Sequence, residues 1–117
     1  MTAMRISDYE FGRVVIADKT YTSDVIVAPE QVIDSWWRKE GHNLQIEDLD
    51  DIVNAKPDML IIGTGYYGRM QVPDETKQYL EERGIKVLQA KTRDAVTEFN
   101  QLQKEYACIV AALHLTC

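Results

Sequence analysis

The second half of the chain alternates short apolar runs with segments of helical periodicity, and this alternation restricts the fold more than any other feature of the sequence. Apolar runs occupy residues 59–62, 85–88 and 106–113. Such runs are typical of strands that are covered on both faces, as the strands of parallel sheets are. Strands that alternate with helices form parallel sheets through right-handed crossovers. We therefore predict a β-α-β-α-β unit with a parallel sheet in the C-terminal half.

The two helices of this unit are marked by their ends. The first is expected to begin at Pro73 and to end at Gly84, because proline is favoured in the first turn and glycine just after the last. The second is expected to be capped by Thr92. The periodicity places Thr76, Tyr79 and Leu80 on the inner face of the first helix, and Ala95, Val96, Phe99 and Leu102 on that of the second. The predicted core residues are Leu60, Ile62, Val87, Phe99, Leu102 and Val110.

The front third has the composition of antiparallel β-structure. Residues 13–17 and 21–27 are rich in β-branched side chains and flank the polar turn 18–20, which predicts a hairpin. A third short strand is predicted over 31–37, and a short helix over 47–55 from its helical spacing of apolar residues. A chain of 117 residues fits one domain. We predict a three-layer α/β domain spanning 1–117, in which the N-terminal β-layer covers one face of the parallel sheet or extends its edge.

Charge and composition exclude several classes of protein. A net charge of −6 disfavours nucleic-acid binding, which needs a basic surface. The longest nearly apolar run, residues 106–115, is about half the length of a membrane-spanning helix, so we expect no membrane insertion. Two cysteines, Cys108 and Cys117, are too few for a disulfide framework, and the start of the chain does not resemble a signal peptide. We therefore expect reduced thiols and a cytoplasmic location.

A glycine motif follows the first apolar run of the second half. Residues 63–68 spell G-x-G-x-x-G, the fingerprint of dinucleotide-binding enzymes. In those enzymes the helix begins within the motif, whereas here it is expected to begin at Pro73. The acidic residue that would hold the ribose is also missing from the end of the next strand, residues 89–93. We expect no dinucleotide cofactor and interpret Gly63 and Gly65 as positions with unusual backbone angles.

The same loop is nevertheless where a small ligand would be expected. Ligands of α/β proteins bind at the carboxyl ends of parallel strands. The second helix starts at this end, so Arg93 is expected to approach the loop and to supply the cation for an anion. His42 and Asn100 could join this site or be ordinary surface and structural residues. The candidate ligand-binding residues are Gly63, Thr64, Gly65, Tyr66, Arg93 and His42.

Other clusters of reactive residue types are weaker. His42, His114, Cys108 and Cys117 are types that bind zinc, but they lack paired C-x-x-C spacing, so we expect no metal. Cys108 is expected mid-strand as a small apolar residue. We find no complete set of catalytic residues.

Trp36 and Trp37 form the second candidate site. Neighbouring residues on a strand face opposite sides, so one indole is expected in the core. The other could anchor a protein partner or be covered by the predicted helix 47–55.

The order of these motifs resembles a known family. Gly63-Thr64-Gly65, Gly84-Ile85, Phe99-Asn100 and Val110-Ala111-Ala112-Leu113 resemble a family of small single-domain proteins that includes the adipogenesis-associated domain protein and a mitochondrial complex I assembly factor. The resemblance covers nearly the whole chain, and the closing His114-Leu115-Thr116-Cys117 is most similar to the adipogenesis-associated branch. It implies a compact α/β domain with a β-layer beside the parallel sheet. It implies no reaction, and the best-understood relatives act by binding other proteins.

Two hypotheses follow. The first is a non-enzymatic protein-interaction or assembly module, with an unidentified protein partner and a possible homo-oligomer. The alternative is a small-molecule or anion-binding protein, possibly an enzyme, that uses the loop 63–66 with Arg93.

Overall fold

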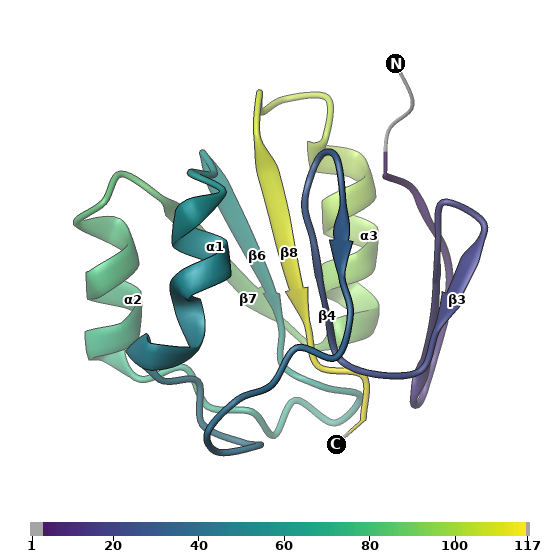
Figure 1. The fold of residues 1–117 in the computed structure, drawn as a ribbon, viewed down its shortest axis with the longest axis horizontal. Coiled ribbons are helices and arrows are strands. Elements are labelled where there is room, and N and C mark those ends of the chain that lie inside the picture. Colours follow the sequence, from purple (N-terminus) through teal and green to yellow (C-terminus); the bar gives the residue numbers. More distant parts are fainter. Residues whose placement is uncertain (1–3, 117) are drawn as a thin grey trace.

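The structure is a computed structural model that describes residues 4–116, and its centre is a sheet of mixed direction (Figure 1). This sheet has the order β5-β4-β8-β6-β7. Its strands are β4 (Val25–Val27), β5 (Val32–Ile33), β6 (Met59–Gly63), β7 (Lys86–Ala90) and β8 (Ile109–Leu113). Strands β6, β7 and β8 are parallel, as predicted, and β4 and β5 extend the sheet in antiparallel pairing.

A second sheet and four helical segments cover the two faces of the central sheet. The smaller sheet, β1-β2-β3, is antiparallel and packs together with α3 (Thr92–Leu102) against one face. The other face is covered by η1 (Ile46–Leu49), α1 (Asp50–Asn54) and α2 (Asp74–Glu81). The strands of the smaller sheet are β1 (Ile6–Glu10), β2 (Arg13–Ile16) and β3 (Lys19–Tyr21). The predicted three-layer α/β fold is therefore confirmed, with the N-terminal segment both covering a face and extending an edge.

Alternate residues of β6 serve two separate cores. Met59 and Ile61 face α3 and the smaller sheet, whereas Leu60 and Ile62 face the helices of the opposite layer. All five residues of β6 are buried, which explains why the strand has a continuous apolar sequence. Within residues 4–116, no helix combines the length and apolar character needed to cross a bilayer.

Several predicted N-terminal boundaries are wrong. The turn of the hairpin is Ala17-Asp18, where both residues have positive φ (48° and 68°), and the predicted second arm, 21–27, is split between β3 and β4 of different sheets. Strand β1 escaped prediction because a bulge breaks its alternation, leaving only Ile6 and Tyr9 buried.

Differences elsewhere are smaller. The predicted strand 31–37 ends at Ile33, and the helix 47–55 is a 3₁₀ turn followed by one short α-helix. The last strand begins at Ile109, so Cys108 precedes it instead of lying mid-strand. Val87 and Leu102 are only half-buried, because β7 is an edge strand and Leu102 is the last residue of α3.

Phe99 offers a direct test of this packing. Its ring is 1% exposed and belongs to the core between α3 and the sheets. Phe99→Ala should lower the free energy of unfolding by about 3–5 kcal/mol, measured by urea denaturation, because it leaves a large cavity. Leu102→Ala, at a half-buried position, should cost clearly less. Equal losses for the two variants would contradict the core described here.

Candidate functional site at the carboxyl ends of the parallel strands

Gly63 and Gly65 are required for different reasons. A Cβ atom on Gly63 would lie 2.8 Å from Thr92 Oγ1 and 3.0 Å from Leu113 Cδ2, so glycine lets α3 approach β6 closely. Gly65 has a φ of 108°, which favours glycine. The expectation of an unusual backbone angle is therefore right for Gly65 and wrong for Gly63, where close approach is the reason.

The backbone amides of Thr64, Gly65 and Tyr66 in the glycine loop are occupied within the fold. Thr64 donates to the carbonyl of Ala90 at 2.9 Å, and Tyr66 donates to the carbonyl of Thr116 at 2.6 Å. The amide of Gly65 donates to Thr92 Oγ1 at 2.8 Å, and that hydroxyl donates to the carbonyl of His114 at 2.6 Å. Thr92 thus joins loop and strand, and it does not cap α3 as predicted. These amides are not free to cradle a pyrophosphate.

Helix α2 also begins too late to serve a dinucleotide. Its first residue is Asp74, and Pro73 occupies the N-cap position. In dinucleotide-binding folds the helix dipole points at the phosphates from within the glycine motif. In this loop no helix begins within the glycine motif, so the phosphate-binding arrangement of dinucleotide-binding enzymes is absent.

Side chains next to the loop do come together. Arg93 lies with its guanidinium carbon 5.6 Å from the centre of the Tyr66 ring. Both line a hollow of about 380 Å³ with Glu10, Phe11 and Tyr67, which we call the aromatic hollow. The expected approach of the start of α3 to this loop is present, and the Thr92 amide donates to the Gly65 carbonyl at 3.1 Å.

The other candidate ligands lie elsewhere. His42 is exposed, its ring centre is 5.7 Å from that of His114, and it is not among the residues that line the aromatic hollow. Asn100 binds both backbone groups of Ile6 and so has a structural role. No group of three His, Cys, Asp or Glu side chains suited to a metal occurs in the described part of the chain. Cys117 lies outside the described residues.

Cys108 is a half-buried thiol at the opposite end of β8. Its sulfur lies 3.6 Å from the carbonyl oxygen of Ala55. Burial, with a smaller contribution from the charge of Asp58, raises the pKa of the Cys108 thiol. A raised pKa disfavours the thiolate, so Cys108 is poorly suited to be a nucleophile.

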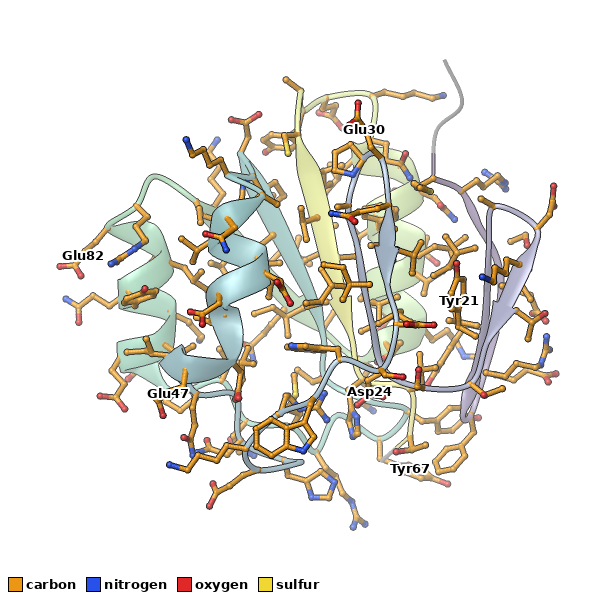
Figure 2. All side chains as sticks on the ribbon, in the orientation of Figure 1. Tyr21, Asp24, Glu30, Glu47, Tyr67 and Glu82 are labelled. Atoms are coloured by element: carbon orange, nitrogen blue, oxygen red, sulfur yellow. The ribbon has the colours of Figure 1, made fainter. Side chains whose placement is uncertain are left out.

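A buried polar cluster, which the sequence did not reveal, lies behind the loops. Asp24 Oδ2 is 2.8 Å from His114 Nδ1 and 2.8 Å from Arg38 Nη1. Asp24 Oδ1 accepts a hydrogen bond from the Leu115 amide at 2.8 Å. Figure 2 labels Asp24 at the end of the sheet where the C-terminal segment emerges. These residues are far apart in the sequence. Asp24 and Arg38 belong to no motif, and His114 and Leu115 stand out only as part of the closing segment 114–117.

The proton on His114 follows from this geometry. Nδ1 also lies 3.0 Å from Arg38 Nη2, but the carboxylate of Asp24 can only accept. Nδ1 therefore carries the proton and donates to Asp24, while Arg38 Nη2 donates to the Gly41 carbonyl at 3.0 Å. Burial alone would raise the pKa of Asp24. The hydrogen bonds from His114 and Leu115 and the charge of Arg38 outweigh it, so that pKa lies below its usual value.

The two tryptophans divide as expected between core and surface. Trp36 is buried, and its Nε1 donates to the Asp48 carbonyl at 3.3 Å. Trp37 is 75% exposed. The left-handed backbone of Ser35, with a φ of 54°, turns the chain out of β5, so the pair lies in a loop and not on the predicted strand.

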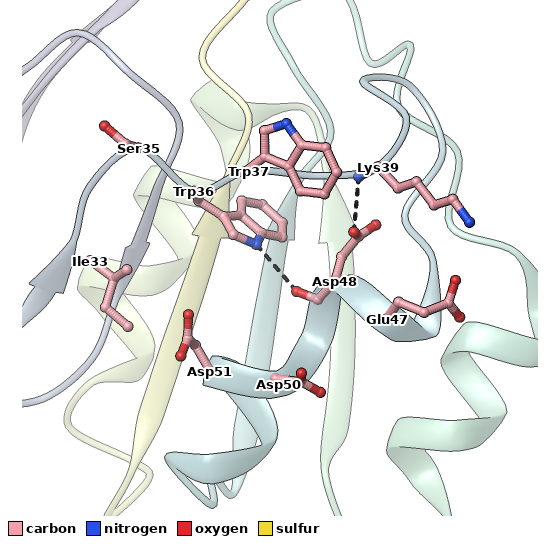
Figure 3. A pocket seen from close by; sticks show the side chains of 9 residues that line it. All are labelled: Ile33, Ser35, Trp36, Trp37, Lys39, Glu47, Asp48, Asp50 and Asp51. Carbon is pink, nitrogen blue, oxygen red and sulfur yellow. Dashed lines mark hydrogen bonds between the residues drawn. The ribbon is translucent and has the colours of Figure 1, made fainter.

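Trp37 lines a hollow of about 370 Å³, which we call the tryptophan hollow (Figure 3). The predicted helix 47–55 supplies carboxylates to its lining and leaves Trp37 uncovered. Asp48 fixes the loop by accepting hydrogen bonds from the amides of Lys39 at 3.0 Å and Gln45 at 2.9 Å. The lining residues are Ile33, Ser35, Trp36, Trp37, Lys39, Glu47, Asp48, Asp50 and Asp51.

Comparison with known proteins places the chain in a family. Residues 6–114 match the model of a protein family of unknown function, DUF498/DUF598. The chain belongs to the DUF498/DUF598 family. The match spans the smaller sheet, the central sheet and the buried cluster up to His114, so the features above lie within the family domain.

Solved structures similar to this DUF498/DUF598 protein share its fold. The conserved hypothetical protein PH1505 from Pyrococcus horikoshii OT3 is 26% identical, with a TM-score of 0.82 over 97% of this chain and 100% of that one. A Bartonella henselae protein described as an outer membrane protein is 24% identical, with a TM-score of 0.81 over 98% and 97%. A Bordetella pertussis protein described as an Mth938-like domain is 18% identical, with a TM-score of 0.71 over 96% and 85%.

The buried cluster generates a prediction about stability. Asp24→Asn would leave the charge of Arg38, whose side chain is 4% exposed, without its carboxylate. The free energy of unfolding at neutral pH should fall by about 3–5 kcal/mol, measured by urea denaturation. Asp8→Asn, which removes an exposed partner of Arg13, is the matched control and should leave stability unchanged within error.

The same measurement has a defined pH dependence. The folded-state pKa of Asp24 is depressed, so its contribution is present above the unfolded pKa of about 3.9 and is lost as the pH falls through the folded pKa. The difference between wild type and Asp24→Asn should therefore be constant from neutral pH down to about 5 and shrink below about 4. A difference that stays constant at low pH would contradict this assignment.

Proposed function

We propose that this protein is a non-enzymatic protein-interaction module that acts in the cytoplasm. One observation carries the proposal: the large apolar side chains exposed in the described chain, Phe11, Trp37, Tyr66 and Tyr67, all lie on loops whose backbone is hydrogen-bonded to Asp24 or to residues 115–116. Exposed aromatic residues gathered on one surface are typical of binding sites for other molecules.

The tryptophan hollow is the proposed anchor site for the partner. An indole that is 75% exposed can bury a large apolar area when a partner docks. The carboxylates of Glu47, Asp50 and Asp51 and the single ammonium group of Lys39 give the lining a net negative charge. A partner segment with arginine or lysine side chains would complement that charge and could place a cation on the indole face.

The resemblance to the adipogenesis-associated branch supports the same class of function. Its best-understood relatives bind other proteins, and the present structure supplies a fixed loop surface suited to that role. We propose that the chain is a member of this branch, with an unidentified protein partner and a possible homo-oligomer.

Affinity purification with matched variants tests the proposal. Trp37→Ser removes the exposed indole, and Glu30→Ser alters an exposed residue near the opposite end of the sheet (Figure 2). Mass spectrometry should identify proteins retained by wild type and Glu30→Ser and depleted at least about fivefold by Trp37→Ser, a loss of about 1 kcal/mol or more. Identical sets of retained proteins for all three would contradict the proposal.

A second candidate function rests on a different observation. The aromatic hollow brings Arg93 beside Tyr66 at the end of the parallel strands, as expected for a small-molecule site. Its ligand would be held by side chains, because the loop amides are engaged within the fold.

A further inference from the structure

The aromatic hollow is built from segments far apart in the sequence. Phe11 comes from the turn between β1 and β2, and Tyr66 and Tyr67 come from the loop after β6. Arg93 enters from the first turn of α3. The volume of about 380 Å³ lies within the range of small-molecule sites, and it suits a ligand with one ring.

The three rings meet at steep angles and remain open to solvent. Their centres are 5.8 Å apart for Phe11 and Tyr66, 6.2 Å for Phe11 and Tyr67, and 5.0 Å for Tyr66 and Tyr67. Phe11 is 51% exposed and Tyr67 is 59% exposed. A flat apolar group placed against these rings would release water from both surfaces and gain aromatic contacts.

The charge beside these rings is predominantly positive. Among residues 4–116, no carboxylate forms an ion pair with Arg93. Glu10, the acidic residue of the lining, is held by Arg13 Nη2 at 2.9 Å. A second guanidinium, that of Arg69, lies 5.9 Å from the centre of the Tyr67 ring. The available cation therefore complements an anionic group on the ligand.

Hydrogen bonds fix the walls before any ligand arrives. The Tyr66 amide donates to the Thr116 carbonyl at 2.6 Å, and the Gly12 amide donates to the Leu115 carbonyl at 2.9 Å. Tyr9 lies next to the cluster, with its ring centre 6.4 Å from that of Tyr66, and its hydroxyl donates to the Leu115 carbonyl at 2.8 Å. Burial raises the pKa of Tyr9 to about 12, so this neighbour stays neutral. A fixed site loses less entropy on binding.

We propose that the aromatic hollow binds a small aromatic anion: a single planar ring that carries a carboxylate or phosphate group. The ring packs against Phe11, Tyr66 and Tyr67, and the anionic group pairs with Arg93. This inference rests on the second candidate function, whose ligand class it names, and its site shares no lining residue with the tryptophan hollow.

Titrations of the ¹⁵N-labelled protein with phenyl phosphate and with benzoate test the proposal. Saturable shifts should centre on Phe11, residues 66–68 and Arg93, with a dissociation constant of about 0.1–10 mM, the range for ligands of this size. Cyclohexanecarboxylate, benzyl alcohol and inorganic phosphate each lack the flat ring or the charge. They should bind at least about fivefold more weakly, since each forfeits a contact of about 1 kcal/mol.

Matched variants assign the roles. Arg93→Gln should weaken benzoate binding by about tenfold. Arg83→Gln removes a guanidinium that also lies over a tyrosine ring, 3.5 Å from the centre of Tyr79, but outside the hollow, and it should change nothing. Three results would overturn the proposal. The first is the absence of saturable shifts at Phe11, residues 66–68 and Arg93 up to about 20 mM probe, twice the weakest dissociation constant expected. The others are equal binding of inorganic phosphate and phenyl phosphate, and equal weakening of benzoate binding by both variants.

Discussion

The Asp24 carboxylate is the constraint on which the loops at one end of the central sheet depend. It lies just before β4 and binds the Leu115 amide, the His114 ring and the Arg38 guanidinium. These contacts join the central sheet, the segment after β8 and the loop that carries the tryptophans. A buried charge network of this kind contributes little net stability relative to an apolar core, but breaking it is costly. Its value here is that it adds polar contacts to the apolar packing of Trp36 and Leu115 and so holds the tryptophan loop and the segment after β8 in one arrangement.

Both hollows depend on loops that this network holds. Arg38 lies with its guanidinium carbon 4.8 Å from the Trp36 ring, and the Asp24 carbonyl accepts a hydrogen bond from the Trp36 amide, so Trp36 is held in and Trp37 faces out. At the aromatic hollow, the Leu115 carbonyl accepts hydrogen bonds from the Gly12 amide and the Tyr9 hydroxyl. These bonds position the turn between β1 and β2, which carries Phe11. Asp24, through its carboxylate and its main-chain carbonyl, and the Leu115 segment that it binds thus hold the loops that display the exposed aromatic residues.

The elements with a clear hydrophobic periodicity could be predicted from the sequence. The cluster held by polar contacts between distant residues could not. Strand β6 and helix α3 follow from a buried apolar run and from helical spacing, because each pattern reflects burial by near neighbours. Strand β7 follows from its apolar run as well, although as an edge strand it is only half-buried or exposed. Strand β1 has a bulge, and Ser35 has a left-handed backbone, so neither leaves a periodic signal. Tyr66 and Arg93 could be placed at one end of the sheet by topology. Phe11 could not, because its position depends on docking the smaller sheet. The Asp24 cluster joins residues 14 to 91 positions apart, which no local pattern marks.

Amide hydrogen exchange in wild type and Asp24→Asn tests the central role of this carboxylate most directly. The variant should lose protection together at the amides of Leu115, Trp36, Gly12 and Tyr66, which are bonded to Asp24 or to residues 115–116 beside it, while the amides of β6 keep a higher protection. That result would show that the Asp24 carboxylate fixes the loops that carry Trp36, Gly12 and Tyr66. Loss of protection at Leu115 alone would contradict this account, as would an equal loss throughout β6.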